Sequence, residues 1–149
     1  MKLKLTMITA ALAVAFTASV AAGSPGAAPM TGTWTGHLTQ EIVLLDPSTG
    51  ETVESEWTKR FTISVLGGRI VRLYTTARSV CPGAVRDHRV AGHWFTGRGP
   101  KLTSGGAFRV KLRGVEIAGA LFARSGAGRV NISSRQCQGK GTWTLKRRL

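Results

Sequence analysis

Acidic residues are scarce in this sequence, and most of them are gathered in one segment. The chain of 149 residues has 21 Lys and Arg but only 7 Asp and Glu, a formal net charge of +14. Five of the acids lie in a segment that has no Lys or Arg: Glu41, Asp46, Glu51, Glu54 and Glu56. From Trp57 to Leu149, by contrast, 19 basic residues face two acids, Asp87 and Glu116. This asymmetry predicts attraction to anionic partners, although a solvated basic surface without a partner has the same composition.

Long apolar runs are also missing, except at the beginning of the chain. Lys2 and Lys4 precede an apolar stretch over residues 5–20, and small residues follow it. This layout is typical of a secretory signal peptide, and it is short for a membrane span. We therefore expect a signal peptide over residues 1–22, a flexible linker over 23–30 and a single domain over 31–149. The expected protein is secreted, either extracellular or associated with the cell wall, with no transmembrane segment after cleavage.

Cysteine occurs only twice, as Cys81 and Cys137. In an oxidising compartment an even number of cysteines indicates a disulfide. The bond would close a loop of about 57 residues, which is worth roughly 4 kcal/mol in the chain-entropy estimate. No further cysteine completes a zinc site, and His37, His88 and His93 lack ligand spacing, so we expect no metal and no cofactor.

Helical periodicity is absent after the first 30 residues, and alternation of period two replaces it. Apolar and polar residues alternate over 53–65 and over 108–113, and turn-forming clusters separate such stretches, including one expected at 125–128. The pattern predicts an all-β domain, a single small antiparallel β-barrel or sandwich of about eight or nine short strands. Gly-Thr-Trp-Thr occurs at 32–35 and again at 141–144, and we expect these first and last strands to be adjacent. Five aromatic residues are expected in the core: Trp34, Trp57, Phe61, Phe108 and Trp143.

Several of these short motifs together resemble a group of known proteins. Gly-Thr-Trp-Thr-Gly at 32–36, Phe-Thr-Ile-Ser-Val at 61–65, Cys81, Cys137 and the second Gly-Thr-Trp-Thr are similar to small exported, disulfide-linked β proteins of actinobacteria. That resemblance implies a fold and export but no reaction. The opening Gly-x-Trp also resembles the first-strand motif of lipocalins and avidins, with Arg147 as the closing-strand cation on the Trp ring. Fold analogy does not transfer function.

Candidate binding residues come from the basic part of the chain. Arg98 and Lys101 lie in a Gly-rich loop over 97–106, and Arg109, Lys111 and Arg113 alternate with apolar residues. The alternation predicts a row of three cations on one outward face, so these five residues are the candidate anion-binding set. Trp94, flanked by His93 and Phe95, is a candidate aromatic contact for a sugar or lipid headgroup, or alternatively part of the core.

Catalytic motifs are not evident. Asp87 and His88 are neighbours on an expected strand, so their side chains point to opposite faces. No Gly-x-Ser-x-Gly sequence is present. We therefore name no catalytic residue and do not expect an enzyme.

The resulting hypothesis is a secreted, non-catalytic β domain that binds an anionic partner of the cell envelope or extracellular space. Cell-wall polymer, lipid headgroups and acidic protein are the partners considered, and nucleic acid is not expected in vivo because the protein is exported. Two alternatives stay open, an inhibitor of a secreted enzyme acting through the 97–106 loop and a calycin-like carrier of a small apolar ligand.

Overall fold

The computed structural model describes residues 30–149, so the expected signal peptide and nearly all of the expected linker lie outside the described residues. The described part has eight strands and no helix. The strands are β1 (Gly32–Leu45), β2 (Thr52–Leu66), β3 (Arg69–Cys81), β4 (Ala84–His93), β5 (Ala107–Leu112), β6 (Val115–Leu121), β7 (Ser125–Ser133) and β8 (Gln138–Arg147). The expected all-β class is therefore confirmed. Within residues 30–149 the structure contains no helix long and apolar enough to span a membrane.

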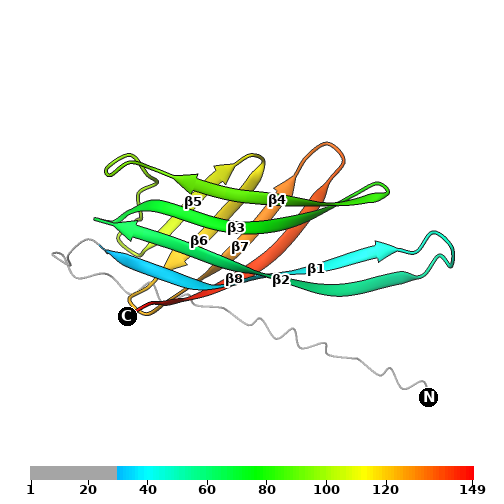
Figure 1. The fold of residues 1–149 in the computed structure, drawn as a ribbon, viewed down its shortest axis with the longest axis horizontal. Coiled ribbons are helices and arrows are strands. Elements are labelled where there is room, and N and C mark those ends of the chain that lie inside the picture. Colours follow the sequence, from blue (N-terminus) through cyan, green and yellow to red (C-terminus); the bar gives the residue numbers. More distant parts are fainter. Residues whose placement is uncertain (1–29) are drawn as a thin grey trace, which may run out of the picture.

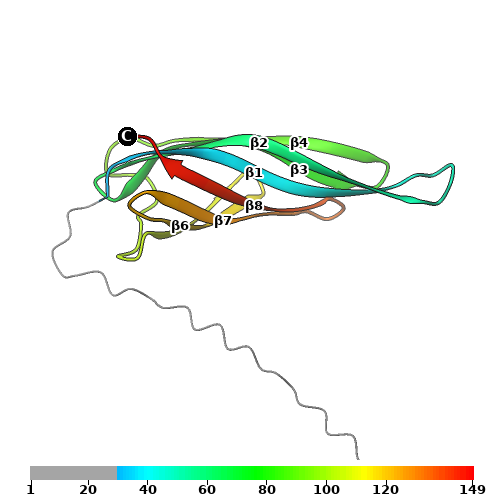
Figure 2. The same cartoon turned by 90° about the horizontal axis from the view of Figure 1, so that it is seen from below.

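All eight strands belong to one antiparallel sheet in the order β4-β3-β2-β1-β8-β7-β6-β5 (Figure 1). The first and last strands are adjacent, as the repeated Gly-Thr-Trp-Thr sequence predicted, with Trp34 opposite Arg147 and Thr39 opposite Thr142. Consecutive strands pair as hairpins everywhere except between β4 and β5. The sheet curls so that β1–β4 lie over β6–β8 (Figure 2), and the ring of strands stays open between β4 and β5.

The segment between β4 and β5 is tied to the start of β3. The backbone N–H of Ile70 donates to the carbonyl of Pro100 at 2.9 Å, and the N–H of Leu102 donates to the carbonyl of Gly68 at 2.9 Å. The side chain of Leu102 is buried in the core. The Gly-rich loop predicted over 97–106 is thus anchored along part of its length.

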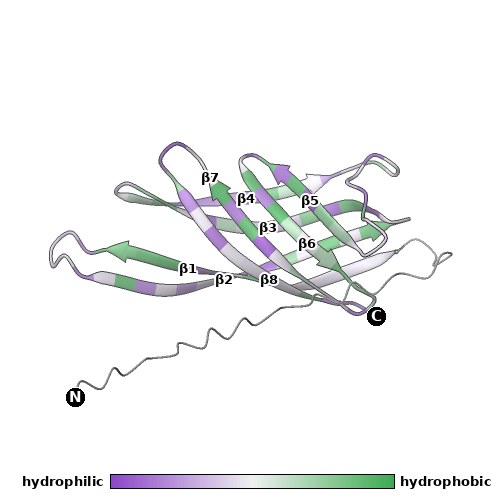
Figure 3. Ribbon diagram, turned by 180° about the vertical axis from the view of Figure 1, so that it is seen from behind, coloured by the Kyte–Doolittle hydropathy of each residue, from purple (hydrophilic) through white to green (hydrophobic). Residues whose placement is uncertain are grey.

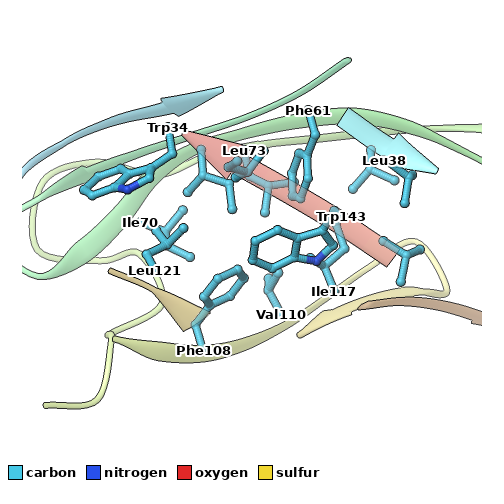
Figure 4. Packing of buried hydrophobic residues seen from close by; sticks show 14 of the residues in the cluster. Trp34, Leu38, Phe61, Ile70, Leu73, Phe108, Val110, Ile117, Leu121 and Trp143 are labelled. Atoms are coloured by element: carbon cyan, nitrogen blue, oxygen red, sulfur yellow. The ribbon is translucent and has the colours of Figure 1, made fainter. Parts of the chain in front are cut away.

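Large side chains occupy the space between the two layers (Figure 4). Trp143 packs at right angles to Phe61, with ring centroids 5.3 Å apart, and stacks on Phe108 at 5.8 Å. The ring also lies against the backbone of β6 and β7, because a Cβ added to Gly119 or Gly128 would come within 2.4 Å of Trp143 Cζ2. Absence of a side chain at these two positions is what makes room for the indole.

These close contacts correct the turn expected at residues 125–128. The residues belong to β7, and the chain turns earlier, at 122–124. Gly126 and Gly128 are there for packing against the core rather than for a turn. Composition alone does not distinguish these two uses of glycine.

Trp57 corrects the predicted core. Trp34, Phe61, Phe108 and Trp143 are all buried, whereas Trp57 is only half-buried and lies outside the core. Its ring is covered by two cations, with the guanidinium of Arg78 at 4.5 Å and Lys59 Nζ at 5.4 Å from the ring centre. Trp57 has the inward parity and lies opposite Gln40, but it lies where β2 is no longer paired with β3.

The hairpin of β1 and β2 extends past the rest of the sheet as a two-stranded ribbon (Figure 1). Pairing of β1 with β8 ends at Thr39, and pairing of β2 with β3 ends at Thr62. Beyond these points β1 and β2 pair only with each other, as far as Leu45 opposite Thr52. We call residues 41–56 the arm.

Gln40 occupies the point where the arm leaves the body. Its side chain is 1% exposed and satisfies backbone groups of two other strands. The amide nitrogen donates to the carbonyls of Arg78 (2.8 Å) and Lys140 (3.3 Å), and its oxygen accepts from the N–H of Arg78 (2.6 Å). The nitrogen and the oxygen of this buried amide both have hydrogen-bond partners, and these bonds hold β1, β3 and β8 together.

A disulfide closes the same end of the molecule. Cys81 at the end of β3 is bonded to Cys137 just before β8, as the sequence predicted. Next to the bond, Val80 pairs with Gln138, so β3 and β8 meet where both β1 and β2 have left the sheet.

Candidate anion-binding face

The outer face of the sheet is built by the residues that alternate with the core. On β1 the side chains of Thr33, Thr35 and His37 face outward and alternate with an inward set that includes the buried Trp34 and Leu38. This follows from the period of two in a strand, which puts each polar residue on the face opposite its apolar neighbours. A strip of hydroxyls therefore runs along the outer side of β1.

Neighbouring strands extend this strip with hydroxyls and cations. Across β1 the register places Ser64 opposite Thr33 and Arg60 opposite His37, and Ser64 is in turn opposite Arg72 of β3. The Thr33 and Ser64 hydroxyls are 3.1 Å apart. On the other side of β1, Lys146 of β8 lies opposite Thr35.

Two adjoining hollows mark this face. The first, of about 410 Å³, is lined by Thr33, Thr35, Arg60, Thr62, Ser64, Arg72, Tyr74 and Arg148. The second, of about 900 Å³, is lined by Thr35, Gly36, His37, Arg60, Phe122, Ser125, Gly126, Ala127, Thr144, Leu145 and Lys146. They share Thr35 and Arg60, and no Asp or Glu lines either of them. We call the two together the basic hollow.

The cations of the basic hollow have no acidic partner within the described part of the chain. Two ion pairs are found in residues 30–149, Arg78 with Asp87 at 2.7 Å and Arg109 with Glu116 at 3.9 Å. Neither involves a residue that lines the basic hollow. The positive charge of Arg60, Arg72, Lys146 and Arg148 is therefore available to a bound anion.

Arg148 is held in place by the backbone. Its N–H donates to the carbonyl of Thr33 at 2.8 Å, which continues the pairing of β8 with β1 past the end of the strand. The preceding residue, Arg147, points inward, and its guanidinium stands 5.3 Å from the centre of the Trp34 ring. Two adjacent arginines thus serve opposite faces, one covering the core and one lining the hollow.

None of the five cations chosen from the sequence lines the basic hollow. Arg109 is paired with Glu116, and Lys111 lies opposite the same Glu116 in the register of β5 and β6. Arg113 has a positive φ of 49° and forms the β5–β6 turn with Gly114. The expected row of three strand cations is therefore wrong at Arg113, because the chain reverses there.

The remaining two predicted cations lie on the segment between β4 and β5. Lys101 is exposed and forms an isolated bridge with Arg69, at the start of β3. Arg98 is exposed, and its N–H donates to the carbonyl of Phe95 in a turn. Their charges are accessible, but no hollow of the basic face includes them.

Trp94 packs against the core instead of standing free in solvent. It is partly buried beside the hydrophobic cluster, and a Cβ on Gly92 would lie 2.2 Å from its Cη2 atom. The ring therefore lies across Gly92. Phe95, 83% exposed, is the solvent-facing aromatic residue of this segment.

Asp87 and His88 point to opposite faces, and each has a different partner. The hydrogen bond from Arg78 is the main cause that lowers the pKa of the Asp87 carboxyl below its usual value. His88 Nε2 lies 2.7 Å from the hydroxyl of Ser79. Ser79 is fully buried, so this Ser–His contact offers no accessible nucleophile to a substrate.

A third hollow, of about 980 Å³, lies between the arm and the body. Carboxylates of Glu41, Glu54 and Glu56 line its arm side, and Glu116, Arg129 and Lys140 line its body side. Its mixed charge distinguishes it from the basic hollow. Within the described residues, no group of three or more His, Cys, Asp or Glu side chains is arranged to hold a metal ion.

The sequence pattern assigns several residues of the basic hollow to the outer face, but it does not show that they lie together. The alternation of β2 already assigns Arg60, Thr62 and Ser64 to the polar face, and Arg72 follows on the next strand. The adjacency of the first and last strands was predicted, but their register was not, and the register is what brings Lys146 opposite Thr35 and Arg148 beside Thr33.

Comparison with known proteins does not assign a family. No protein-family model, no curated protein and no solved structure matches this chain.

Proposed function

We propose that this protein is a non-catalytic binding module for an anionic polymer of the cell envelope or extracellular space. The observation that carries the proposal is the basic hollow, in which cations and hydroxyls adjoin without a carboxylate. Guanidinium groups match phosphate, sulfate and carboxylate oxygens in a bidentate fashion, and hydroxyls add hydrogen bonds of adjustable direction. Arg60 lies in both hollows and is the centre of the proposed site.

A linear polymer is the ligand class that suits the shape of this face. The two hollows adjoin and cross β3, β2, β1 and β8, so a chain with repeated negative groups can contact Arg72, Arg60 and Lys146 in turn. A single small anion would occupy only one of the two hollows. The space between the two layers is filled by core residues, so the proposed ligand lies on the outer face.

The proposed location is outside the cytoplasm. The disulfide is consistent with an oxidising compartment, and the expected signal peptide points the same way. The partners there are anionic polysaccharides, phosphodiester polymers of the cell wall and anionic lipid headgroups. The repeated charges of a polymer favour the first two.

Retention on immobilised heparin or teichoic acid over a salt gradient tests the proposal. A hollow variant carries Arg60→Ala, Arg72→Ala, Lys146→Ala and Arg148→Ala. A matched control carries Arg98→Ala, Lys101→Ala, Arg109→Ala and Lys111→Ala. Both variants lose four positive charges, so a difference between them reports position and not net charge.

We expect the wild type and the control to elute at similar salt and the hollow variant to elute much earlier. The salt dependence of the affinity should also become less steep in the hollow variant, because fewer counterions are released on binding. Equal retention of the two variants would show that net charge alone drives binding. Elution of the wild type with a neutral protein would remove the anionic-polymer proposal altogether.

A further inference from the structure

The arm has an unusual surface for a projection into solvent. It carries five acids and no Lys or Arg, a charge of −5. It also exposes four large apolar side chains, Val43 (46%), Leu44 (36%), Leu45 (69%) and Val53 (52%). Figure 3 shows the β1 side of the arm in the colour of hydrophobic residues. Apolar groups gathered on a projecting element indicate an interaction surface.

The backbone of the arm is exposed as well. Beyond Thr39 the edge of β1 is no longer paired with β8, and before Thr62 the edge of β2 is not paired with β3. Isolated two-stranded ribbons are marginally stable in water, and unpaired edges are sites where another chain can bind. The arm thus combines negative charge, apolar side chains and open strand edges.

We propose that the arm of one copy docks into the basic hollow of a second copy of this chain. Arg60, Arg72, Lys146 and Arg148 supply the opposite charge, and no carboxylate of the hollow repels the arm. Exposed apolar groups are present on both sides, since Phe122 (51%) and Tyr74 (41%) line the hollow.

Charge also decides which surfaces meet. An arm-to-arm contact would bring five acids against five acids, and an encounter of like charges costs free energy at an interface. An arm-to-hollow contact pairs opposite charges. The contact is therefore head-to-tail, with different surfaces of the two copies meeting.

The dependence of this association on salt follows from the overall charge. Residues 30–149 carry 19 Lys and Arg and 7 Asp and Glu, so copies with a net +12 repel one another at a distance. At an ionic strength of about 0.15 M the Debye length is about 8 Å, which screens the distant repulsion more than the contacts in the interface. We expect association to be weakest at very low and very high salt and strongest in between.

Sedimentation velocity over a salt series tests the inference with the purified protein. The arm variant carries Glu54→Gln and Glu56→Gln, both at exposed positions. The matched control carries Thr96→Lys and Ala107→Lys, exposed residues away from the arm and the hollow, and it changes the net charge by the same +2. We expect the dissociation constant to rise roughly tenfold or more in the arm variant, with little change in the control. Wild-type protein that stays monomeric at about 0.1 mM across the salt series overturns the proposal.

A charge-exchange experiment tests which surfaces meet. Glu54→Lys with Glu56→Lys changes the charge of the arm from −5 to −1, and Arg60→Glu with Lys146→Glu changes the summed charge of Arg60, Arg72, Lys146 and Arg148 from +4 to 0. Each variant alone should be monomeric. Their mixture should associate, because the unchanged acidic arm of the second variant meets the unchanged hollow of the first. A mixture that stays monomeric while wild type associates contradicts the arm-to-hollow contact.

Carbodiimide coupling locates the contact directly. In a mixture of ¹⁴N- and ¹⁵N-labelled copies, we expect links from Glu54 or Glu56 to Lys146 between differently labelled chains. Lys140 lines the groove beside the arm of the same copy, so its links within one chain serve as an internal reference. The absence of Lys146 from all links between copies would contradict the inference.

The inference rests on the basic hollow of the proposed function, but the two can fail separately. Heparin retention is measured on the same arm and control variants. Wild-type protein that is retained on heparin but stays monomeric removes the docking inference and keeps the proposed function. Wild-type protein that self-associates but is not retained on heparin removes the proposed function and keeps the docking inference. Where both hold, a soluble anionic polymer should dissociate the assembly, because the polymer and the arm compete for one site.

Discussion

The two Gly-Thr-Trp-Thr segments place their tryptophans in the same core with different hydrogen bonding. Trp34 and Trp143 are 0% and 1% exposed. The indole N–H of Trp34 donates to the carbonyl of Phe122 at 3.0 Å, whereas Trp143 Nε1 is buried without a hydrogen-bond partner. The same substitution, Trp→Phe, therefore has different consequences at the two positions.

The magnitudes follow from what each substitution removes. At Trp34 the protein loses a hydrogen bond, worth about 0.5–1.5 kcal/mol, and much of the cation–π contact with Arg147, worth about 0.5–1 kcal/mol. At Trp143 the substitution removes a buried N–H that has no hydrogen-bond partner. This removal stabilises the fold by about 1–3 kcal/mol and offsets part of the cost of the smaller ring. We expect Trp34→Phe to lower the free energy of unfolding by at least about 2 kcal/mol more than Trp143→Phe, which is the sum of the lower ends of these ranges.

Urea denaturation followed by near-ultraviolet circular dichroism measures this difference, with the disulfide intact in all variants. Trp143→Ala is the control for burial, and it should cost about 3–5 kcal/mol because it leaves a cavity between Phe61 and Phe108. Equal costs for the two Trp→Phe variants, or a larger cost at Trp143, would refute the reasoning. That result would mean that the Trp143 N–H is satisfied in solution.

Three further predictions concern the junction, the disulfide and pH. Gln40→Leu should cost about 2–4 kcal/mol and speed hydrogen exchange of the Arg78 amide, because both backbone groups of Arg78 lose their partner. Cys81→Ala with Cys137→Ala should lower the free energy of unfolding by about 2–5 kcal/mol in denaturant titrations. Arg78 lowers the pKa of Asp87 in the folded protein. The stabilisation from the Arg78–Asp87 ion pair should therefore be present above about pH 4 and lost as the pH falls further. At this half-exposed site the loss should be about 0.2–1 kcal/mol and absent in Asp87→Asn.

Local patterns in the sequence predicted the elements that depend on neighbouring residues. Alternation and turn-forming residues located the strands, since both report backbone geometry over a few residues. The disulfide and the adjacency of the first and last strands could also be predicted, one from the cysteine count and the other from the repeated Gly-Thr-Trp-Thr. Neither prediction required knowledge of how the chain folds between the two cysteines or between the first and last strands.

Properties that depend on how the strands are arranged in space could not be predicted from local sequence patterns. Trp57 and Phe61 have the same parity on β2, but only Phe61 belongs to the buried core cluster. The difference is set by where β8 leaves β1, which no pattern within β2 records. The basic hollow depends on the register of the β1–β8 pairing, which the repeated sequence does not give and which puts Lys146 in the same hollow as Arg60.

The fold also gives a spatial meaning to the separation of charge along the sequence. The outer face of β1 passes from Thr33 and Thr35 in the basic hollow to Glu41 at the base of the arm. One strand therefore connects a basic end and an acidic end, and this polarity is what a head-to-tail contact requires. Each copy that docks its arm leaves its own hollow free for another arm, so the contact repeats unless the geometry closes a ring. Growth is limited because every added copy brings a net positive charge, and a bound anionic polymer would remove that repulsion while competing for the hollows.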